Sequence, residues 1–359
     1  MGCFKNKCKV NKTYKKYNEM RLGFNPNKDQ ETASLTYSHQ IIIPVYIPSQ
    51  NDYFKNSLTI LKLCLDSLFL TVHKKTFITV VNNGSCDEVK YYLQELYFEK
   101  KIHEVLETPN IGKLNAILKG IVGHNFPLIT ITDSDVLFLN GWQKASYSIF
   151  ENFPKAGVVC PTPSSRSLRT FTSNIYWDNF FSRKLAFSKV KNPLALKNFA
   201  FSVGNPDFYN KSHLENYFTV SNKNEKAVIG AGHFVGTYRG EIFSSLGVKY
   251  SNYKLGGGSE SEILDIPVVK KGFWRLSTED NYAYHMGNVL EDWMNDEVSK
   301  LEKNILEVDF KLKSVKASSK WLYIIKSKIF GKIILNKKIM KHFLIWKGLS
   351  KEGAINYLI

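Results

Sequence analysis

Two carboxylates stand inside an otherwise apolar run of this chain, in the motif Asp133-Ser134-Asp135. The flanking segments Leu128–Thr132 and Val136–Phe138 are apolar or β-branched, so the motif is expected at the end of a buried strand. An unpaired charge is unfavourable in such a place, and a divalent cation would offset it. Carboxylate oxygens suit Mg²⁺ or Mn²⁺, and such an ion can bridge the phosphates of a nucleotide. The alternative is a turn or a helix N-cap.

The segments around this motif alternate between β-branched apolar runs and stretches with helical periodicity. The pattern predicts strands at Ile41–Tyr46, Phe77–Val81, Glu104–Glu107 and Leu128–Thr132, and helices at Ser57–Thr71, Asp87–Lys100 and Lys113–Val122. Such alternation predicts an α/β fold with a mainly parallel sheet and helices on both faces.

Polar residues stand at or just after the ends of three predicted strands, at Pro44–Tyr46, Asn82–Ser85 and Asp133–Asp135. Ligands of an open α/β sheet bind beyond the carboxyl ends of its strands. We therefore expect these three segments to converge on one edge of the sheet.

Taken in order, these motifs resemble those of the family 2 glycosyltransferases over about residues 39 to 290. The resemblance rests on Ile41–Tyr46, Val80–Ser85, Asn110–Lys113 with Ala116, and Asp133–Asp135. It implies the GT-A fold, which has a Rossmann-like, mainly parallel sheet flanked by helices. It also implies an enzyme that uses a nucleotide-sugar donor and a divalent cation, Mn²⁺ or Mg²⁺.

The resemblance assigns part of the nucleotide site to the first two strands. Pro44, Val45 and Tyr46 would line the base and ribose, and Asn82 or Asn83 would recognise the edge of the base. The family's second strand usually ends in Asp-Asp or Asp-Asn, whereas this chain has two asparagines, which bring no charge. A UDP donor is the expectation, and the departure leaves the base open. An ordinary Asn-Gly turn is the alternative.

By the same resemblance, Lys113 approaches the nucleotide, and Asp133, Ser134 and Asp135 serve the ribose and the metal. His285 stands where family members often supply a further metal ligand, and a neutral imidazole can complete a carboxylate site. The predicted metal ligands are therefore Asp133, Asp135 and His285. The alternative for a lone histidine is a structural or exposed role.

A transferase that inverts the anomeric centre needs a carboxylate base for the acceptor hydroxyl. In the family, an acidic motif about a dozen residues before a Gly-aromatic pair supplies it. Here Glu260 holds the first acidic position before Gly272-Phe273, and Ser261 replaces the second acid. The base is therefore expected to be Glu260 or Glu262. A pair of acids at a helix start is the alternative.

The segment Gly230–Phe234 resembles the family's acceptor-side segment. A glycine such as Gly232 permits close approach to a sugar, and His233 would contact the acceptor. The alternative is a glycine-rich turn between strands.

The chain has 359 residues, of which 43% are hydrophobic, and a formal net charge of +17. This composition predicts one sizeable folded domain with appendages. The charge predicts an anionic partner, whether nucleic acid, a phospholipid surface or a phosphorylated substrate. Five scattered cysteines lack metal-ligand spacing, so we expect reduced thiols with no disulfide and no zinc cluster.

We expect a basic arm at 1–38, a GT-A domain at 39–310 and a basic amphipathic tail at 311–359. The domain divides into a nucleotide-sugar half, 39–156, and an acceptor half, 157–310. Lysines alternate with apolar residues in the tail, which is typical of binding to an anionic membrane surface. The lysine-rich N-terminus lacks an apolar region, so we do not expect a secretory signal, and no apolar run has the length expected of a spanning helix. We therefore expect a cytoplasmic protein, peripheral on the cytosolic face of the membrane.

The sequence thus predicts an inverting, metal-dependent glycosyltransferase that moves a sugar, from UDP by expectation, to a glycan or lipid-linked acceptor in surface polysaccharide synthesis. One alternative is a basic nucleic-acid-binding protein, but no helix-turn-helix, zinc-finger or RNP motif is present and no nucleic acid is expected. The other is a sugar nucleotidyltransferase, which would resemble its family in a Gly-rich loop after the first strand. This chain has Pro44-Val45-Tyr46-Ile47-Pro48 there.

Overall fold

The computed structural model describes residues 23, 25–30, 37–223, 225–305, 310–315 and 318–358. The chain divides into a small unit, 1–35, and a large unit, 36–359. Most of the predicted basic arm, 1–38, lies outside the described residues, apart from a turn at 26–29. Across the described ranges, no helix has the length and apolar character needed to cross a bilayer.

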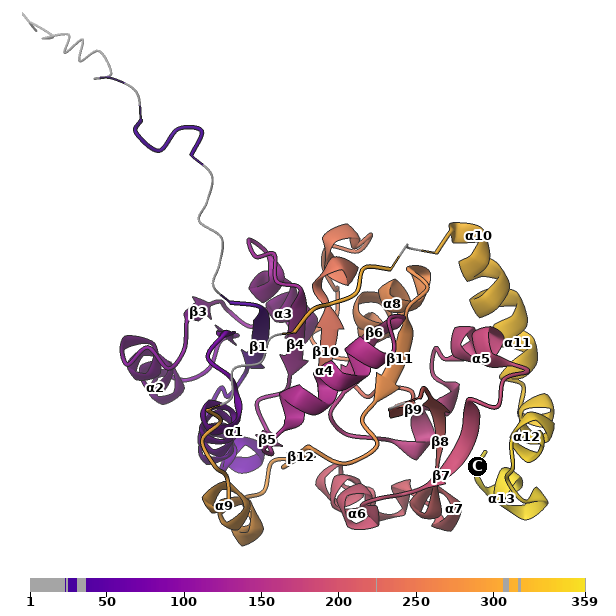
Figure 1. Ribbon diagram of the computed structural model, residues 1–359. Helices are drawn as coiled ribbons and strands as arrows, with labels where there is room; N and C mark the ends of the chain where they lie inside the picture. The colour runs from indigo at the N-terminus through magenta and orange to yellow at the C-terminus, as the bar shows by residue number, and fades with distance from the viewer. Residues whose placement is uncertain are drawn as a thin grey trace, which may run out of the picture. The chain divides into compact units, whose positions relative to one another are not determined.

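The large unit contains twelve described strands (Figure 1). They are β1 (His39–Val45), β2 (Thr76–Asn82), β3 (Glu104–Glu107), β4 (Leu128–Thr132), β5 (Val136–Phe138), β6 (Ala156–Cys160), β7 (Leu185–Lys189), β8 (Asn216–Ser221), β9 (Lys226–Ile229), β10 (Val235–Arg239), β11 (Trp274–Ser277) and β12 (Ala283–His285). Ten of them form one sheet in the order β3-β2-β1-β4-β10-β6-β11-β9-β8-β7, and β5 pairs with β12 in a second sheet.

The α-helices alternate with the strands in the first half of the unit and gather at its C-terminal end. They are α1 (Ser57–Thr71), α2 (Asp87–Phe98), α3 (Lys113–Ile121), α4 (Trp142–Asn152), α5 (Ser173–Asn179), α6 (Pro193–Ser202), α7 (Lys211–Glu215), α8 (Ile266–Lys270), α9 (Asp292–Ser299), α10 (Lys320–Tyr323), α11 (Phe330–Ile334), α12 (Lys337–Trp346) and α13 (Lys351–Asn356). The predicted α/β fold class, a sheet flanked by helices with a helical C-terminal region, is confirmed.

The parallel part of the sheet is β3-β2-β1-β4, the segment in which the sequence alternates between strand and helix. Alternate residues of β1 pack on opposite faces of the sheet, because successive side chains of a strand point in opposite directions. Ile41 and Ile43 lie in the cluster that includes α1, whereas Ile42 lies in the cluster that includes α3. Helices therefore cover both faces, as the sequence predicts.

The second half of the sheet is mixed. β10 runs antiparallel to both β4 and β6, and β9, β8 and β7 continue in antiparallel pairs, while β11 is parallel to β6. The insertion of β10 beside β4 is important for the site, because it brings the segment before β10 against the carboxyl end of β4. The two-stranded sheet does the same for the residues at the end of β12.

The predicted basic tail, 311–359, is irregular at 311–315, becomes mainly helical from Lys320 onward and packs on the domain. Met340, Phe343, Leu344 and Tyr357 are buried in the same cluster as Phe218 of β8. Nothing in the lysine-rich sequence pattern alone distinguishes a docked helix from a free one. The docking is decided by the buried apolar residues of α11, α12 and α13, such as Ile334, Met340 and Ala354, which join the core cluster of the sheet.

Candidate active site

The turn between β4 and β5 carries Asp133 and Asp135 and is held by backbone bonds from two distant segments. The N–H of Asp133 donates to Phe234 O at 2.8 Å, and the N–H of Met286 donates to Asp135 O at 2.8 Å. His285 pairs with Val136 in the β5–β12 sheet, so it lies directly beside Asp135. Pairing of β12 with β5 therefore brings the predicted third ligand to the first two.

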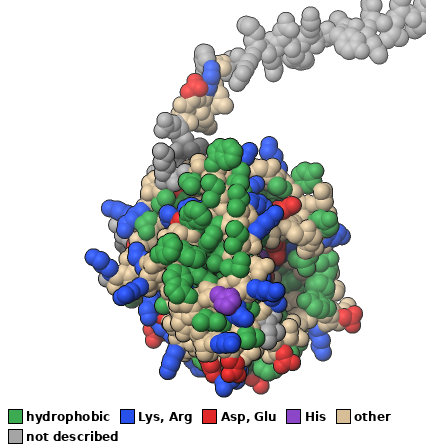
Figure 2. All heavy atoms as spheres, turned by 90° about the vertical axis from the view of Figure 1, so that its right-hand side faces the viewer, with side chains coloured by type: hydrophobic (Ala, Val, Ile, Leu, Met, Phe, Trp, Pro, Cys, Tyr) green, Lys and Arg blue, Asp and Glu red, His purple; other side chains and the backbone are tan. Residues whose placement is uncertain are grey.

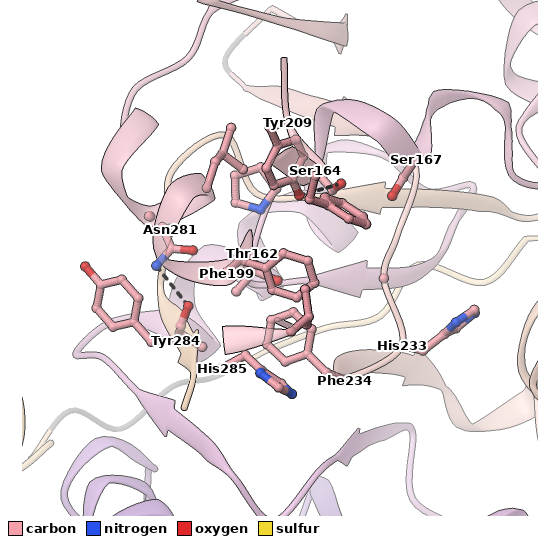
Figure 3. Close-up of a pocket in the computed structure, with 17 residues that line it drawn as sticks. Thr162, Ser164, Ser167, Phe199, Tyr209, His233, Phe234, Asn281, Tyr284 and His285 are labelled. Atoms are coloured by element: carbon pink, nitrogen blue, oxygen red, sulfur yellow. Dashed lines mark hydrogen bonds between the residues drawn. The ribbon is translucent and has the colours of Figure 1, made fainter. Parts of the chain in front are cut away.

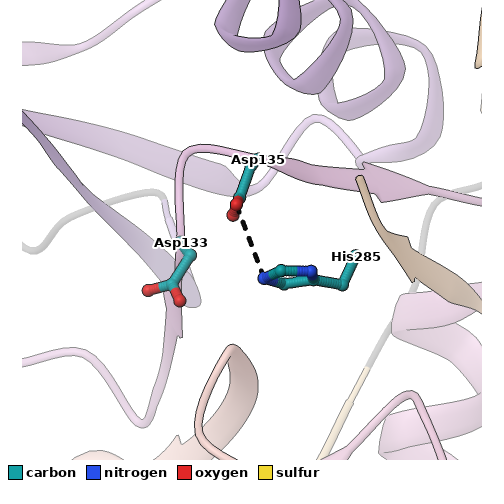
Figure 4. Close-up of side chains that lie close together, drawn as sticks. All are labelled: Asp133, Asp135 and His285. Carbon is teal, nitrogen blue, oxygen red and sulfur yellow. Dashed lines mark ion pairs between the residues drawn. The ribbon is translucent and has the colours of Figure 1, made fainter. Parts of the chain in front are cut away.

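Asp133, Asp135 and His285 form a group with metal-binding geometry (Figure 4). One candidate ligand atom from each residue lies within 4.8 Å of the others. His285 Nε2 is 3.4 Å from Asp135 Oδ2, and Ser202 Oγ lies 2.9 Å from His285 Nδ1 and orients the ring. An imidazole held through its other nitrogen in this way is typical of metal ligands.

The electrostatics of this group fit a cation. Asp135 Oδ1 is buried and has no hydrogen-bond partner among the described residues. Burial raises the pKa of Asp135 to about 6, and Asp133 acts in the same direction, while His285 and Lys113 lower it. A divalent cation bound by these oxygens would supply the missing partner. The residues present therefore fit the metal that the sequence predicts.

Lys113 is the first residue of α3, and its side chain extends to the metal-binding group. Its Nζ lies 2.6 Å from Asp133 Oδ1 and 3.7 Å from Glu260 Oε1. Burial lowers the pKa of Lys113, but Asp133 and Glu260 outweigh this effect and raise it overall, so the side chain is a cation. Gly112 precedes it with φ of 91°, and a Cβ there would come within 2.9 Å of Lys254. The close approach of these two segments fixes the start of α3.

Glu260 and Glu262, the two candidate bases, lie in different surroundings. Glu260 is half-buried and faces Lys113, with Asp133 on the other side of that lysine. Glu262 is exposed and lines a separate surface hollow with Ser259. The geometry brings only Glu260 of this pair to the metal group.

His233, predicted on the acceptor side, contacts Glu260 and a buried carboxylate. Its Nδ1 is 3.5 Å from Glu260 Oε2, and its Nε2 is 2.9 Å from Asp265 Oδ1. Asp265 is fully buried and pairs with Arg275 Nη2 at 2.7 Å. Arg275 in turn donates to the carbonyl of Ala231, two residues before His233. Asp265 and Arg275 therefore hold His233 against Glu260.

The sequence prediction missed Asp265 and Arg275. Both carried the signal that singled out Asp133, because each is a charge inside an apolar segment, Ile263–Val269 and Phe273–Leu276 respectively. Charges of this kind need a partner, and here they are each other's. The signal was present in the sequence, but the pairing requires the fold.

The side chains predicted to recognise the base are hydrogen-bonded to neighbouring parts of the protein. Asn82 Nδ2 donates to Glu107 at 2.8 Å and Asn82 Oδ1 accepts from the N–H of Ser85. Asn83 Oδ1 accepts from the N–H of Ile111 at 2.9 Å. Both side chains are buried, so these amides fix the loops that follow β2 and β3. Recognition of a base edge by either one stays a prediction.

Pro44, Val45 and Tyr46 differ in their exposure. The Val45 side chain is buried in the core cluster that includes α1, Pro44 is half-buried, and Tyr46 is exposed with its ring edge-to-face with Phe54. Tyr46 is therefore accessible to a ligand, whereas the side chain of Val45 is not. The Val45 carbonyl accepts from the N–H of Asn83, which ties β1 to the second loop.

A cavity of about 280 Å³ opens beside the metal group (Figure 3). His285 and His233 lie on its wall, together with Gly232 and Phe234 from the predicted acceptor-side segment. The other lining residues are mostly apolar or aromatic. They come from residues 162–167, from α6 and the residues after it up to Tyr209, and from residues 281–284. The rings of Phe199 and Phe234 stack with centroids 5.4 Å apart.

The fold and site therefore define an α/β protein with carboxylates, a lysine and a histidine gathered at the carboxyl edge of a parallel sheet. Residues 41–218 match the sequence model of Glycosyl transferase family 2, and over this segment the chain belongs to that family. The family resemblance drawn from the motifs is confirmed. No curated protein matches the sequence.

Solved structures similar to this chain include two bacterial or archaeal enzymes. S. aureus TarS 1–349 is 14% identical with a TM-score of 0.41, and the match covers 69% of this chain and 60% of TarS 1–349. A mannosyltransferase from Pyrobaculum calidifontis, solved with GDP-Man and Mn²⁺, is 14% identical with a TM-score of 0.44, and the match covers 89% of this chain and 73% of that one. This chain thus spans less than two thirds of TarS 1–349.

Proposed function

We propose that this chain is an inverting, metal-dependent glycosyltransferase. It would move a sugar from a nucleotide diphosphate, UDP by first expectation, to a hydroxyl of a glycan or lipid-linked acceptor in surface polysaccharide synthesis. The observation that carries the proposal is the meeting of Asp133, Asp135 and His285 with Lys113 and Glu260 at the carboxyl end of β4. Family membership over residues 41–218 supports the same class of reaction.

The donor side of the site is built for a diphosphate. A divalent cation held by Asp133, Asp135 and His285 would offset the charge that develops on the leaving diphosphate. Lys113 adds a fixed positive charge that now pairs with Asp133. Charges placed in advance where negative charge develops stabilise a transition state without reorganisation. Among the similar solved structures, the P. calidifontis mannosyltransferase is in complex with GDP-Man and Mn²⁺, and TarS 1–349 is in complex with UDP-GlcNAc.

Glu260 is the base in this proposal. It takes the proton of the acceptor hydroxyl as that oxygen bonds to the anomeric carbon of the donor. The bond between this carbon and the diphosphate oxygen breaks on the opposite side, so the configuration inverts and the nucleoside diphosphate leaves. His233 positions the Glu260 carboxylate at 3.5 Å, and Asp265 holds His233 in turn. Glu262 is exposed and forms no ion pair with any described residue.

The acceptor would occupy the cavity of about 280 Å³ beside His285 and His233. Small-molecule pockets have volumes of about 300 Å³ or more, and this cavity is at the lower end of that range. Its volume therefore suits one sugar ring rather than a long oligosaccharide. Aromatic side chains such as Phe199 and Phe234 offer faces on which the apolar side of a sugar can stack. Tyr209 and Ser164, whose hydroxyl oxygens lie 3.0 Å apart, offer polar groups for sugar hydroxyls.

A screen of nucleotide-sugars by thermal denaturation tests the proposal, with UDP-, GDP- and dTDP-sugars each measured with Mn²⁺, with Mg²⁺ and with a chelator. A ligand that binds only the folded state at 100 times its Kd stabilises it by about 2.7 kcal/mol, which is a readily measured rise in melting temperature. One donor class should stabilise the protein only when the cation is present. Stabilisation by none of them, or pyrophosphate exchange with a nucleoside triphosphate, would overturn the proposal.

A further inference from the structure

The helical segment 320–334 carries apolar side chains that the described part of the chain leaves exposed. It runs through α10, a π-helical stretch at Ile324–Ile329 and α11. Trp321, Ile325, Ile329 and Ile333 recur every fourth residue and are 75%, 36%, 56% and 52% exposed. Residues at this spacing lie on one side of a helix. A continuous apolar stripe thus runs along the outside of the segment.

The orientation of this segment is fixed by contacts on its other side. Lys326 Nζ lies 2.5 Å from Asp178 Oδ1, and both side chains are largely buried. Asp178 also pairs with Lys155 at 2.8 Å and accepts from the indole N–H of Trp274. Gly331 packs so closely on Ser173 that a Cβ would come within 3.1 Å of its hydroxyl. The outward stripe is therefore a consequence of rigid docking.

Aromatic side chains from two other elements extend the stripe. Phe181, two residues after α5, is 87% exposed, and Trp346, the last residue of α12, is 54% exposed. Their rings lie 6.4 Å apart, and the ring of Phe180 contacts both of them as well as Phe330 of α11. We refer to Trp321, Ile325, Ile329, Ile333, Phe181 and Trp346 together as the apolar face.

Lysines surround the apolar face, and acidic residues are nearly absent from its helices. Residues 310–359 contain twelve lysines and one acidic residue, Glu352. Lys328 and Lys332 are exposed on the helical segment itself, and Arg183 and Lys184 follow Phe181. Figure 2 views the side of the molecule where α10 to α13 lie, and it shows a broad band of hydrophobic side chains bordered by basic ones.

We propose that the apolar face docks on an anionic phospholipid bilayer. Tryptophan and aliphatic side chains on one face, bordered by lysines, is the composition that binds at the headgroup boundary of a membrane. Lysines near such a surface gain energy from its negative potential. A second copy of this chain fits less well, because a symmetric contact would oppose lysines with lysines. Nucleic acid offers phosphates to the lysines but no partner for the isoleucine stripe.

Vesicle sedimentation of the full chain, without donor or acceptor, tests this inference separately from the proposed transfer reaction. The probes are vesicles of phosphatidylglycerol with phosphatidylcholine, and vesicles of phosphatidylcholine alone. The wild-type protein should bind the anionic vesicles and be released by high salt. The variant Trp321→Ser/Ile325→Ser/Ile329→Ser should bind them roughly ten-fold or more weakly, since apolar burial supplies much of the affinity.

Two further variants make the result specific. Lys328→Glu/Lys332→Glu changes only exposed lysines and should lower binding to anionic vesicles by a similar factor. The matched control Tyr97→Ser/Phe98→Ser/Val122→Ser removes three side chains that are 48%, 78% and 77% exposed and should leave binding unchanged. Two of these control residues end α2 and the third follows α3 directly, and neither helix belongs to the apolar face. Figure 1 shows α2 on the left of the molecule and α10 on the right.

Any of three results would overturn the proposal. The first is that the wild-type protein does not bind anionic vesicles, and the second is that the control variant lowers binding as much as the apolar-face variant does. The third is that light scattering shows a dimer for the wild-type protein and a monomer for the apolar-face variant, because the face would then bind a second copy of the chain. Thermal denaturation checks that each variant is folded. If the apolar-face variant is not folded, the binding of the lysine variant decides the test.

Discussion

The surroundings of Asp135 are unfavourable for its charge in the absence of a metal. Burial and the neighbouring Asp133 raise the pKa of its carboxyl group, and one carboxylate oxygen has no hydrogen-bond partner among the described residues. A cation would reverse the balance, because the same two carboxylates that repel each other are a favourable ligand pair for a divalent ion. The residue therefore destabilises the metal-free protein at neutral pH and would stabilise the metal-bound one.

Replacing Asp135 with Asn separates these two effects. Without metal, Asp135→Asn should leave the melting temperature unchanged or raise it, since one of two neighbouring buried charges is removed. With Mn²⁺, the variant should lose the metal-induced rise in melting temperature and at least about 100-fold in kcat/KM, the lower end of what one electrostatic group contributes. Retained metal-dependent stabilisation, measured by calorimetry, would exclude Asp135 as a ligand.

The proposed choice of Glu260 over Glu262 as the base can be tested with single substitutions. Glu260→Gln should lower kcat by at least about 100-fold, the usual contribution of general base catalysis, with little change in KM for the donor. Glu262→Gln should leave kcat within about two-fold, because that side chain is exposed in a separate hollow. Steady-state kinetics with both variants decides, and equal losses would refute the assignment.

His233→Gln gives an independent readout of how the base is positioned. The amide group of the glutamine can still donate a hydrogen bond to Asp265, but it cannot carry a charge. The substitution should therefore alter the dependence of kcat on pH and have a smaller effect on KM. His233→Ala should reduce kcat further, since neither contact remains. A purely structural histidine would instead lower the melting temperature and leave the pH profile of the residual activity unchanged.

At the scale of elements, β1, β4 and α4 are joined by buried polar groups. His39 of β1 lies 2.5 Å from the Tyr147 hydroxyl through Nδ1 and 2.7 Å from Thr130 Oγ1 through Nε2. Gln143 Nε2 is 3.1 Å from the same Nδ1, and His73 Nε2 is 2.8 Å from the Tyr147 hydroxyl. An amide donor at Nδ1 requires a neutral ring there, so this junction is satisfied only without an added proton.

This network makes the fold sensitive to acid. Burial lowers the pKa of His39 well below its ordinary value, with His73 acting in the same direction. Burial likewise lowers the pKa of His73 to about 4. The unfolded chain then binds more protons than the folded one below about pH 6.5, so stability is full above that pH and falls as the pH decreases toward 4.

From pH 7.5 to pH 5, the free energy of unfolding should drop by about 2 kcal/mol from His73 alone. Urea denaturation at the two pH values measures the change. His73→Gln should flatten this dependence, whereas His342→Gln, on the exposed side of α12, should leave it as in the wild type. An unchanged slope in the His73 variant would contradict the assignment.

At the scale of the whole molecule, the C-terminal helices complete the core. Met340, Phe343, Leu344 and Tyr357 share a buried cluster with Tyr176 and Phe218 of the sheet domain. Full burial of one such side chain contributes about 1.5–3 kcal/mol, and the net stability of a protein is about 5–15 kcal/mol. The segment cannot act as a detachable tether.

Deleting residues 319–359 should therefore yield insoluble protein or lower the melting temperature by more than ten degrees, on the order of the loss of several buried side chains. The apolar-face variant, which changes only exposed residues of the same segment, should melt within about two degrees of the wild type. Differential scanning calorimetry compares the two. A soluble, well-folded truncation would show that the docking contributes little.

Local pattern was sufficient for much of the fold. The helix Ser57–Thr71 and the strands Glu104–Glu107 and Leu128–Thr132 occur at the predicted residues, and the other predicted elements of this half differ only at their ends. Hydrophobic periodicity and β-branched runs specify such elements because they depend on neighbours in sequence. The antiparallel insertion of β10 next to β4 was not predicted, since strand order depends on contacts between distant segments.

The sequence by itself determined that two carboxylates end a buried strand, because a charge in an apolar run needs a partner wherever the chain folds. It also determined which residue types were available to serve as ligand and base. Only the tertiary structure decided which of them meet: Glu260 rather than Glu262 beside Lys113, and Asp265 with Arg275 behind His233. Glu260 lies far from Lys113 in the sequence, and Asp265 and Arg275 belong to different elements. The distances between them follow from strand order and packing, which no local pattern encodes.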